Sequence, residues 1–238
     1  MRQHPVPASQ TLPIELHFWP TPNGQKISIA LEEFGVPYAV HFVDIGKGDQ
    51  LKPGFLAISP NNRIPAIVDP EGPDGKPISV FESGAILIYL ADKFGRFYGS
   101  NARERVAITE WLMWQMAGVG PMFGQFNHFH DYAPEKLPYA ITRYTDEVHR
   151  LYRVLNTQLK GKDYVAGPYS IADMALYAWT RNWSGREVDA EAEFPDFVAW
   201  SNRVAARPAV QKGMALKKEG YTPGIRTEEE RKILFGQR

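Results

Sequence analysis

The sequence predicts two domains, an α/β domain followed by an all-helical domain. Three observations support this prediction. Strand and helix patterns alternate from Ile14 onward, the strand patterns stop before Gly95, and helical patterns then follow one another to about residue 218. We therefore place the boundary near residues 95–100. The predicted parts are a flexible proline-rich arm (1–13), the α/β domain (14–95), the helical domain (100–218) and a C-terminal extension (219–238).

The first domain should contain four strands and two main helices. In residues 14–19 apolar and polar side chains alternate, which is typical of a strand with one buried face. Residues 24–34 repeat apolar side chains at helical spacing, and Gly35 ends the run. The same patterns predict strands at 38–45, 64–69 and 78–81 and a helix at 83–95.

The helix at 83–95 is apolar on nearly all sides, so we expect protein to cover both of its faces. In the second domain, glycines and a proline at 118–124 should bend the first helical segment. The predicted segments of that domain are about 100–130, 137–160, 170–182, 195–206 and 207–218.

Composition narrows the range of functions. Lys plus Arg and Asp plus Glu both number 27, so the chain has no net charge to attract nucleic acid or an anionic membrane. No apolar run approaches the ~20 residues of a membrane helix, and the N-terminus lacks the apolar stretch of a secretory signal. We therefore expect a cytoplasmic protein without nucleic-acid or membrane partners.

Cysteine is absent, so any thiol chemistry must use a thiol that a ligand brings. This absence also excludes disulfide bridges and thiolate metal sites. The six histidines show no spacing typical of metal ligands, and His128 and His130 form only a loose pair. No metal is expected.

Three motifs, in this order and spacing, resemble the glutathione S-transferase family: "RIPAIVD" (63–69), "FESGAILIYLADKFG" (81–95) and "GPYSIADMALYAW" (167–179). The resemblance runs from about Ile14 to Leu216. It implies a thioredoxin-like first domain, a helical second domain, bound glutathione without a metal, and a homodimer.

A finer resemblance points to the Nu class, whose relatives include bacterial disulfide-bond reductases and a fungal nitrogen-regulator branch. It lies in "TPNGQK" (21–26), "KPGFLAISPNNRIPAIVD" (52–69) and "FGQFNHF" (123–129). Tyr-type classes would show a tyrosine where this chain has "WPT" (19–21), and the absence of cysteine excludes the Cys-type classes.

The resemblance assigns two binding elements in the first domain. A cis bond before Pro65 would turn the backbone of Ile64 toward the cysteinyl part of glutathione, like an added strand residue. Ser83 is a reasonable N-cap for the following helix, whose N-terminus suits the γ-glutamyl carboxylate. Glu82 suits the γ-glutamyl ammonium. Without the resemblance, Pro65 is a strand-start proline and Ser83 is only a cap.

The connector after the second strand carries Gln50 and Lys52. By resemblance, Gln50 grips the glycine carboxylate of glutathione, and Lys52 adds positive charge. Without the resemblance, both are solvated loop residues.

The reacting thiol should lie at the turn "WPTPNGQK" (19–26). A free thiol has a pKa near ~8.5. Lowering that pKa by about two units takes ~2.7 kcal/mol of preferential stabilisation of the thiolate. A helix N-terminus supplies roughly 0.3–2 kcal/mol, and one hydrogen bond to a charged acceptor supplies roughly 1.5–3 kcal/mol. The Thr21 hydroxyl and the Asn23 side-chain N–H are the available donors, and neither is a base. The alternative is a plain turn with an asparagine cap.

Two functions follow from the resemblance. The first is an enzyme that reduces disulfides with bound glutathione thiols, two per site. By resemblance Arg143 would hold the second molecule, and the alternative is that Arg143 is a solvent-facing helix charge. An alternative enzyme activity is the conventional conjugation of glutathione to electrophiles. The second is a glutathione-binding regulatory module with little catalysis, which is less favoured because only ~13 residues precede the first strand, whereas the fungal regulators carry a long low-complexity region.

Two further capping motifs have structural roles. Ser170 and Asp173 form a capping box that should stabilise the helix after it. In the C-terminal extension, Thr227 and Glu230 repeat the pattern before three consecutive apolar residues. We expect Ile233–Phe235 to dock on the protein surface, near the mouth of the cleft or on a partner subunit.

Overall fold

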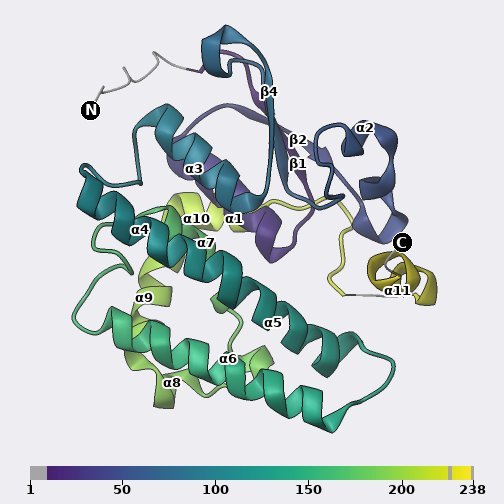
Figure 1. Ribbon diagram of the computed structural model, residues 1–238, viewed down its shortest axis with the longest axis vertical. Coiled ribbons are helices and arrows are strands. Elements are labelled where there is room, and N and C mark those ends of the chain that lie inside the picture. The colour runs from purple at the N-terminus through teal and green to yellow at the C-terminus, as the bar shows by residue number, and fades with distance from the viewer. Residues whose placement is uncertain (1–9, 225–226, 237–238) are drawn as a thin grey trace. The chain divides into compact units, whose positions relative to one another are not determined.

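The computed structural model describes residues 10–224 and 227–236, and they fall into two compact units (Figure 1). The first unit runs to Gly95 and takes in the segment from Gln211 onward. The second unit is Arg96–Val210. No helix in the described ranges is both long and apolar enough to cross a membrane.

A four-stranded sheet with the order β2-β1-β3-β4 forms the centre of the first unit. β1 pairs in parallel with β2, whereas the β1–β3 and β3–β4 pairs are antiparallel. The alternation predicted from the sequence is real, because Ile14, Leu16 and Phe18 are all fully buried. The strand bounds are β1 Ile14–Phe18, β2 Tyr38–Phe42, β3 Ala66–Asp69 and β4 Ile78–Phe81.

Three helices pack on this sheet: α1 Pro22–Phe34, α2 Pro53–Leu56 and α3 Ser83–Phe94. Figure 1 shows α1 and α3 on one face and α2 on the other. Glycine is required at the start of α1, since a Cβ on Gly24 would lie 2.1 Å from the carbonyl oxygen of Trp19. The α1 turn and the end of β1 are therefore held close together.

The single chain covers α3 on one side, so the expected cover of both faces stays a prediction. Ile86, Leu87 and Leu90 are fully buried, but Ala85 is exposed and Ile88 is only half-buried. The sheet and α1 cover one side of the helix, since a helix that packs on one sheet can bury only one stripe.

The second unit is helical, as predicted. The interruption expected at 118–124 takes the form of a wide π-helical turn at Gln115–Val119, directly before Gly120 and Pro121. A second π-helical turn spans His128–Tyr132. The helices are α4 Ala102–Trp114, α5 Gly120–Asn127, α6 Pro138–Leu159, α7 Ile171–Thr180, α8 Ala190–Glu193 and α9 Pro195–Ala205.

The capping box at the start of α7 is confirmed. Asp173 is completely buried, and its carboxylate accepts from the backbone N–H groups of Ser170 and Val165, both at 3.0 Å, and from the indole of Trp200 at 2.9 Å. Burial raises the pKa of Asp173, and these donors oppose that change. The role of this carboxylate is structural.

The second half of α10 (Pro208–Ala215), from Gln211 onward, belongs to the first unit. The sequence placed residues up to 218 in the helical domain, but Gly213 packs against α1. The Ser28 hydroxyl donates to its carbonyl at 2.7 Å, and a Cβ on Gly213 would lie 2.6 Å from the Ile29 nitrogen. Glycine permits this close contact.

Both ends of the chain are partly held by the first unit. Of the predicted flexible arm, residues 1–9 lie outside the described residues, while Gln10 and Thr11 donate to the carboxylates of Asp69 and Glu71 at 3.1 and 2.9 Å. The last helix is α11, Glu228–Phe235, which Thr227 caps by accepting from the Glu230 N–H at 3.1 Å.

Candidate functional site

The turn that starts α1 places two polar side chains at a helix N-terminus. Thr21 is the N-cap, and its hydroxyl oxygen accepts from the Gly24 N–H at 3.2 Å. Accepting this bond leaves the hydroxyl hydrogen available to donate. Asn23 is the second helical residue and is half-buried. The cap is therefore threonine, not the asparagine of the plain-turn alternative, and the turn presents donors without a base.

The start of α3 differs in detail from the prediction. Glu82 is the N-cap, because its carbonyl accepts the first helical bond from Ile86 at 2.9 Å, and Ser83 is the first helical residue. The expectation that Ser83 caps the helix is therefore wrong. Glu82 has φ 68°, a conformation that costs about 1–3 kcal/mol for a residue with a Cβ. Its carboxylate is exposed and accepts from the Asn61 amide at 3.3 Å.

A buried lysine, which the sequence analysis did not predict, joins these two helix starts. Lys26 is 1% exposed, and its ammonium donates to the Ser83 hydroxyl oxygen at 3.2 Å. Burial lowers the pKa of Lys26 to about 7, and the Glu82 carboxylate opposes this. A cation beside a helix N-terminus favours an anionic ligand. The sequence did carry a signal, since Asn23, Lys26 and Ala30 share one helix face.

The residue before β3 has unused backbone groups. The Ile64–Pro65 bond is cis, as predicted. The side chain of Ile64 packs against Val43, Phe55 and Ala66, and within the described ranges neither its N–H nor its C=O makes a hydrogen bond. The backbone of Ile64 is therefore able to pair with an extended peptide.

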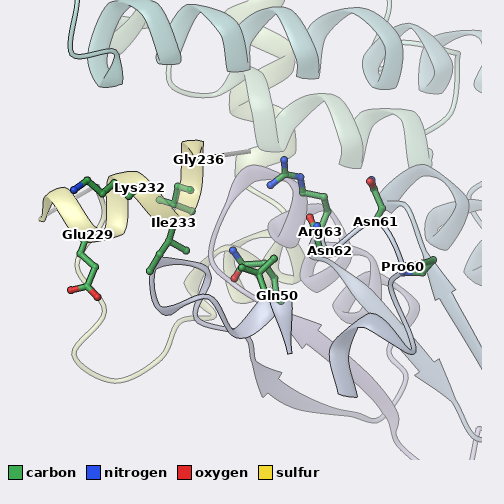
Figure 2. Close-up of a pocket in the computed structure, with 11 residues that line it drawn as sticks. Gln50, Pro60, Asn61, Asn62, Arg63, Glu229, Lys232, Ile233 and Gly236 are labelled. Atoms are coloured by element: carbon green, nitrogen blue, oxygen red, sulfur yellow. The ribbon is translucent and has the colours of Figure 1, made fainter. Parts of the chain in front are cut away.

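Gln50 lies in the wall of a pocket of about 600 Å³ within the first unit (Figure 2). It is 4% exposed, so it is not a solvated loop residue. Its amide nitrogen donates to the Ile45 carbonyl at 3.2 Å, and its amide oxygen is buried without a partner. The lining residues are Gln50, Leu51, Pro60, Asn61, Asn62, Arg63, Glu229, Lys232, Ile233, Leu234 and Gly236.

Lys52 does not line this pocket. Its ammonium lies 2.6 Å from Asp49, and this bond lowers the pKa of the Asp49 carboxyl. The cations that line the pocket are Arg63 and Lys232, both exposed. The positive charge expected beside Gln50 is thus present, but on residues that the sequence analysis did not name.

The expected docking of the C-terminal extension is confirmed for Ile233 and Leu234. Ile233 and Leu234 are half-buried and line the Gln50 pocket, while Phe235 stays 36% exposed. Earlier in the extension, Tyr221 packs edge-on against Trp19, with ring centroids 5.5 Å apart. The extension therefore contacts its own unit at two places.

Arg143 belongs to the second unit, where it is exposed on α6. The hydrogen bond from Arg150 does most to lower the pKa of the nearby Glu147, and the charge of Arg143 adds to it. Its part in ligand binding stays a prediction. Within the described part of the chain, no three His, Cys, Asp or Glu side chains form a metal-binding group.

Comparison with known proteins places the chain in a family. The profile of the glutathione S-transferase N-terminal domain matches residues 21–93, and that of the C-terminal domain matches residues 115–208. The chain belongs to the glutathione S-transferase family. The predicted thioredoxin-like α/β domain followed by a helical domain is therefore confirmed for this glutathione S-transferase.

Its relatives include disulfide-bond oxidoreductase YfcG of Escherichia coli, which is 50% identical over 86% of this chain and 95% of that protein. A glutathione transferase of Burkholderia graminis, solved with two glutathione molecules per subunit, is 45% identical with a TM-score of 0.84 and covers 90% and 92% of the two chains. One of Pseudomonas putida, solved with one glutathione disulfide per subunit, is 42% identical with a TM-score of 0.83 over 88% and 94%.

Proposed function

We propose that this glutathione S-transferase is a glutathione-dependent disulfide-bond oxidoreductase. The observation that carries the proposal is the turn at the start of α1, which offers Thr21 and Asn23 as donors in a chain without any cysteine. Such a site can stabilise a ligand's thiolate but cannot form a covalent bond through sulfur of its own. The YfcG relative and the two structures with bound glutathione or its disulfide support this function.

Glutathione would lie across three elements of the first unit. Its γ-glutamyl carboxylate sits at the N-terminus of α3 beside Ser83 and Lys26, and its ammonium pairs with Glu82. The unused N–H and C=O of Ile64 pair with the cysteinyl residue. Gln50 binds at the glycyl end. This pose puts the cysteinyl sulfur near the start of α1, where Thr21 and Asn23 lie.

The reaction proceeds in two exchanges. The bound glutathione thiolate attacks one sulfur of the substrate disulfide, forming a mixed disulfide and releasing the other sulfur as a thiolate. A second glutathione thiolate then attacks the glutathione sulfur of the mixed disulfide, which releases the second substrate thiolate and leaves glutathione disulfide. Two electrons pass from two glutathiones to the substrate, and each released thiolate takes up a proton. The protein's share is to hold the first thiolate ionised.

The finer features belong to the same proposal. We place the chain in the Nu class, as a cytoplasmic homodimer that binds two glutathiones per site, the second held by Arg143. The exposed half of α3 gives the dimer a contact face. The structure with two glutathiones per subunit supports the stoichiometry.

The test is turnover of a small dialkyl disulfide with glutathione, followed by the appearance of glutathione disulfide, alongside calorimetric stoichiometry. We expect turnover and two binding events per subunit. Faster conjugation of an aryl halide than reduction of the disulfide would instead make the chain a conventional conjugating transferase. Binding without either reaction would favour the regulatory alternative.

A further inference from the structure

The C-terminal helix α11 is seated on the loop that carries Gln50. A Cβ on Gly46 would lie 3.4 Å from Cγ of Glu230, and one on Gly48 would lie 3.8 Å from Cγ2 of Ile233. Figure 2 shows α11 on one side of Gln50 and the Asn62–Arg63 segment on the other. The helix is therefore part of the pocket wall rather than a remote tail.

Two features of this pocket point to an anionic ligand that also carries an N–H. Within the described residues, neither Arg63 nor Lys232 has an ion-pair partner. The buried amide oxygen of Gln50 lacks a donor, although the residue is 96% enclosed. Among the described residues, Glu229 supplies the only carboxylate in the pocket lining. Cations without partners and an unfilled acceptor match a C-terminal amino acid, which has a carboxylate and an amide N–H.

We propose that α11 completes the glycyl end of the glutathione site and makes it selective for a peptide that ends in a free glycine carboxylate. Lys232 supplies positive charge for the carboxylate, and Ile233 supplies a wall that limits what can extend beyond the glycine. This inference rests on the proposed function, because it takes glutathione as the ligand and Gln50 as its glycyl contact.

The two residues act by different physics, so different ligands separate them. Glutathione amide, with the glycine carboxylate converted to an amide, loses the charge and keeps the size. The glycine ethyl ester loses the same charge and adds two carbons. The ratio of Kd values for the amide and glutathione therefore measures the contribution of the Lys232 charge. The ratio for the ester and the amide measures the steric effect of Ile233.

The experiment measures Kd for the three ligands by calorimetry with the full chain, Lys232→Gln, Ile233→Ala and a truncation after Pro223 that keeps Tyr221. The full chain should bind glutathione at least several-fold more tightly than the amide. Lys232→Gln should reduce that preference about two- to fivefold, the range for an exposed ion pair. Ile233→Ala should lower the ratio of the ester Kd to the amide Kd. The truncation should lower both this ratio and the ratio of the amide Kd to the glutathione Kd.

Arg231→Gln is the matched control, since it removes the same charge from the same helix at a residue that does not line the pocket. It should leave both preferences unchanged. If the full chain and all variants bind glutathione but show the same two Kd ratios, amide to glutathione and ester to amide, then α11 has no role in selectivity. The proposed function would remain intact. Failure of the full chain to bind glutathione at all would instead overturn the proposed function.

Discussion

The two ends of the proposed glutathione site are built in different ways. At the γ-glutamyl end, Lys26 and Ser83 are 1% and 4% exposed, and the packing of α1 against α3 fixes both. At the glycyl end, Arg63 and Lys232 are exposed, and one of the two comes from a helix near the end of the chain. The first end is part of the core, and the second is assembled on the surface.

This difference separates affinity from selectivity. Below its pKa of about 7, Lys26 is a buried, hydrogen-bonded cation, and the cost of burying that charge is met when the chain folds. Its contribution to binding is then preorganised. Exposed side chains on a short helix must be ordered when the ligand binds, which reduces what they add. We therefore expect the core end to control whether glutathione binds and the surface end to control which glutathione derivative binds.

The largest effect should come from the thiol position between the two ends. Asn23→Ala removes a side-chain N–H from the first turn of α1 and should lower kcat/KM for disulfide reduction roughly tenfold or more, because a hydrogen bond to a charged group contributes ~1.5–3 kcal/mol. The measurement is steady-state turnover of a small disulfide. Asn23→Asp should cost more, since its carboxylate repels the thiolate, and wild-type rates in either variant would refute the assignment.

At the core end, Glu82 allows binding and stability to be separated. Glu82→Ala removes the partner of the ligand ammonium and should raise the Kd for glutathione roughly tenfold. Glu82→Gly should weaken binding equally but raise the melting temperature relative to Glu82→Ala, because glycine adopts φ 68° without a Cβ clash. Calorimetry and thermal melts measure the two effects.

Unchanged affinity in both Glu82 variants would mean that this helix start only supports the fold. A lower melting temperature for Glu82→Gly than for Glu82→Ala would show that the positive φ carries little strain, since glycine also loses more chain entropy on folding.

The strands and helices of the first domain could be predicted from the sequence, because each local pattern agrees with the place of its element in the sheet. The alternation in residues 14–19 and the stop at Gly35 were both predicted correctly, and so was the cis bond before Pro65, through the family resemblance. The return of Gly213 to the first unit was not, because a contact between segments so far apart in the chain leaves no local periodicity.

The site was predicted where a motif marks it and missed where only packing does. Glu82 and Ser83 lie in a family motif, and the resemblance assigned Gln50 by its position on the connector; the part of all three in ligand binding stays a prediction. Lys26 was overlooked because a charged side chain in an amphipathic helix is usually exposed. Lys232 was overlooked because no local pattern connects α11 with the Gln50 loop.

Lys26 gives the core end a pH dependence that the surface end lacks. Its pKa falls from 10.5 to about 7 on burial, so between these values the unfolded chain binds more protons than the folded one. The contribution of this group to the free energy of unfolding therefore rises as pH increases from about 7 toward 10.5. Below pH 7 the cost of burying the charge is fully present. Relative to Lys26→Met, the wild type should gain stability between pH 6.5 and about 9.5.

Chemical denaturation across that pH range measures this difference. Lys47→Met is the matched control, because Lys47 is 74% exposed at its side chain, so the substitution removes a lysine without touching a buried site. A stability difference for Lys26→Met that does not change with pH would show that the buried ammonium keeps its proton in the folded state.

The smallest expected effect is on the stability that α11 gives to the surface end. Ile233 and Leu234 are only half-buried, so each contributes less than the ~1.5–3 kcal/mol of a fully buried side chain, and ordering costs ~1–2 kcal/mol per residue. Truncation after Pro223 should therefore lower the melting temperature by at most about 2–4 °C without ligand. The difference in melting temperature should widen with saturating glutathione, because bound ligand then also stabilises α11.

Ile233→Ser should reproduce part of this ligand-dependent loss of melting temperature, whereas Phe235→Ser, at a residue outside the pocket lining, should not. If melting temperature and activity were unchanged by the truncation with and without glutathione, α11 would have no role at this end of the site.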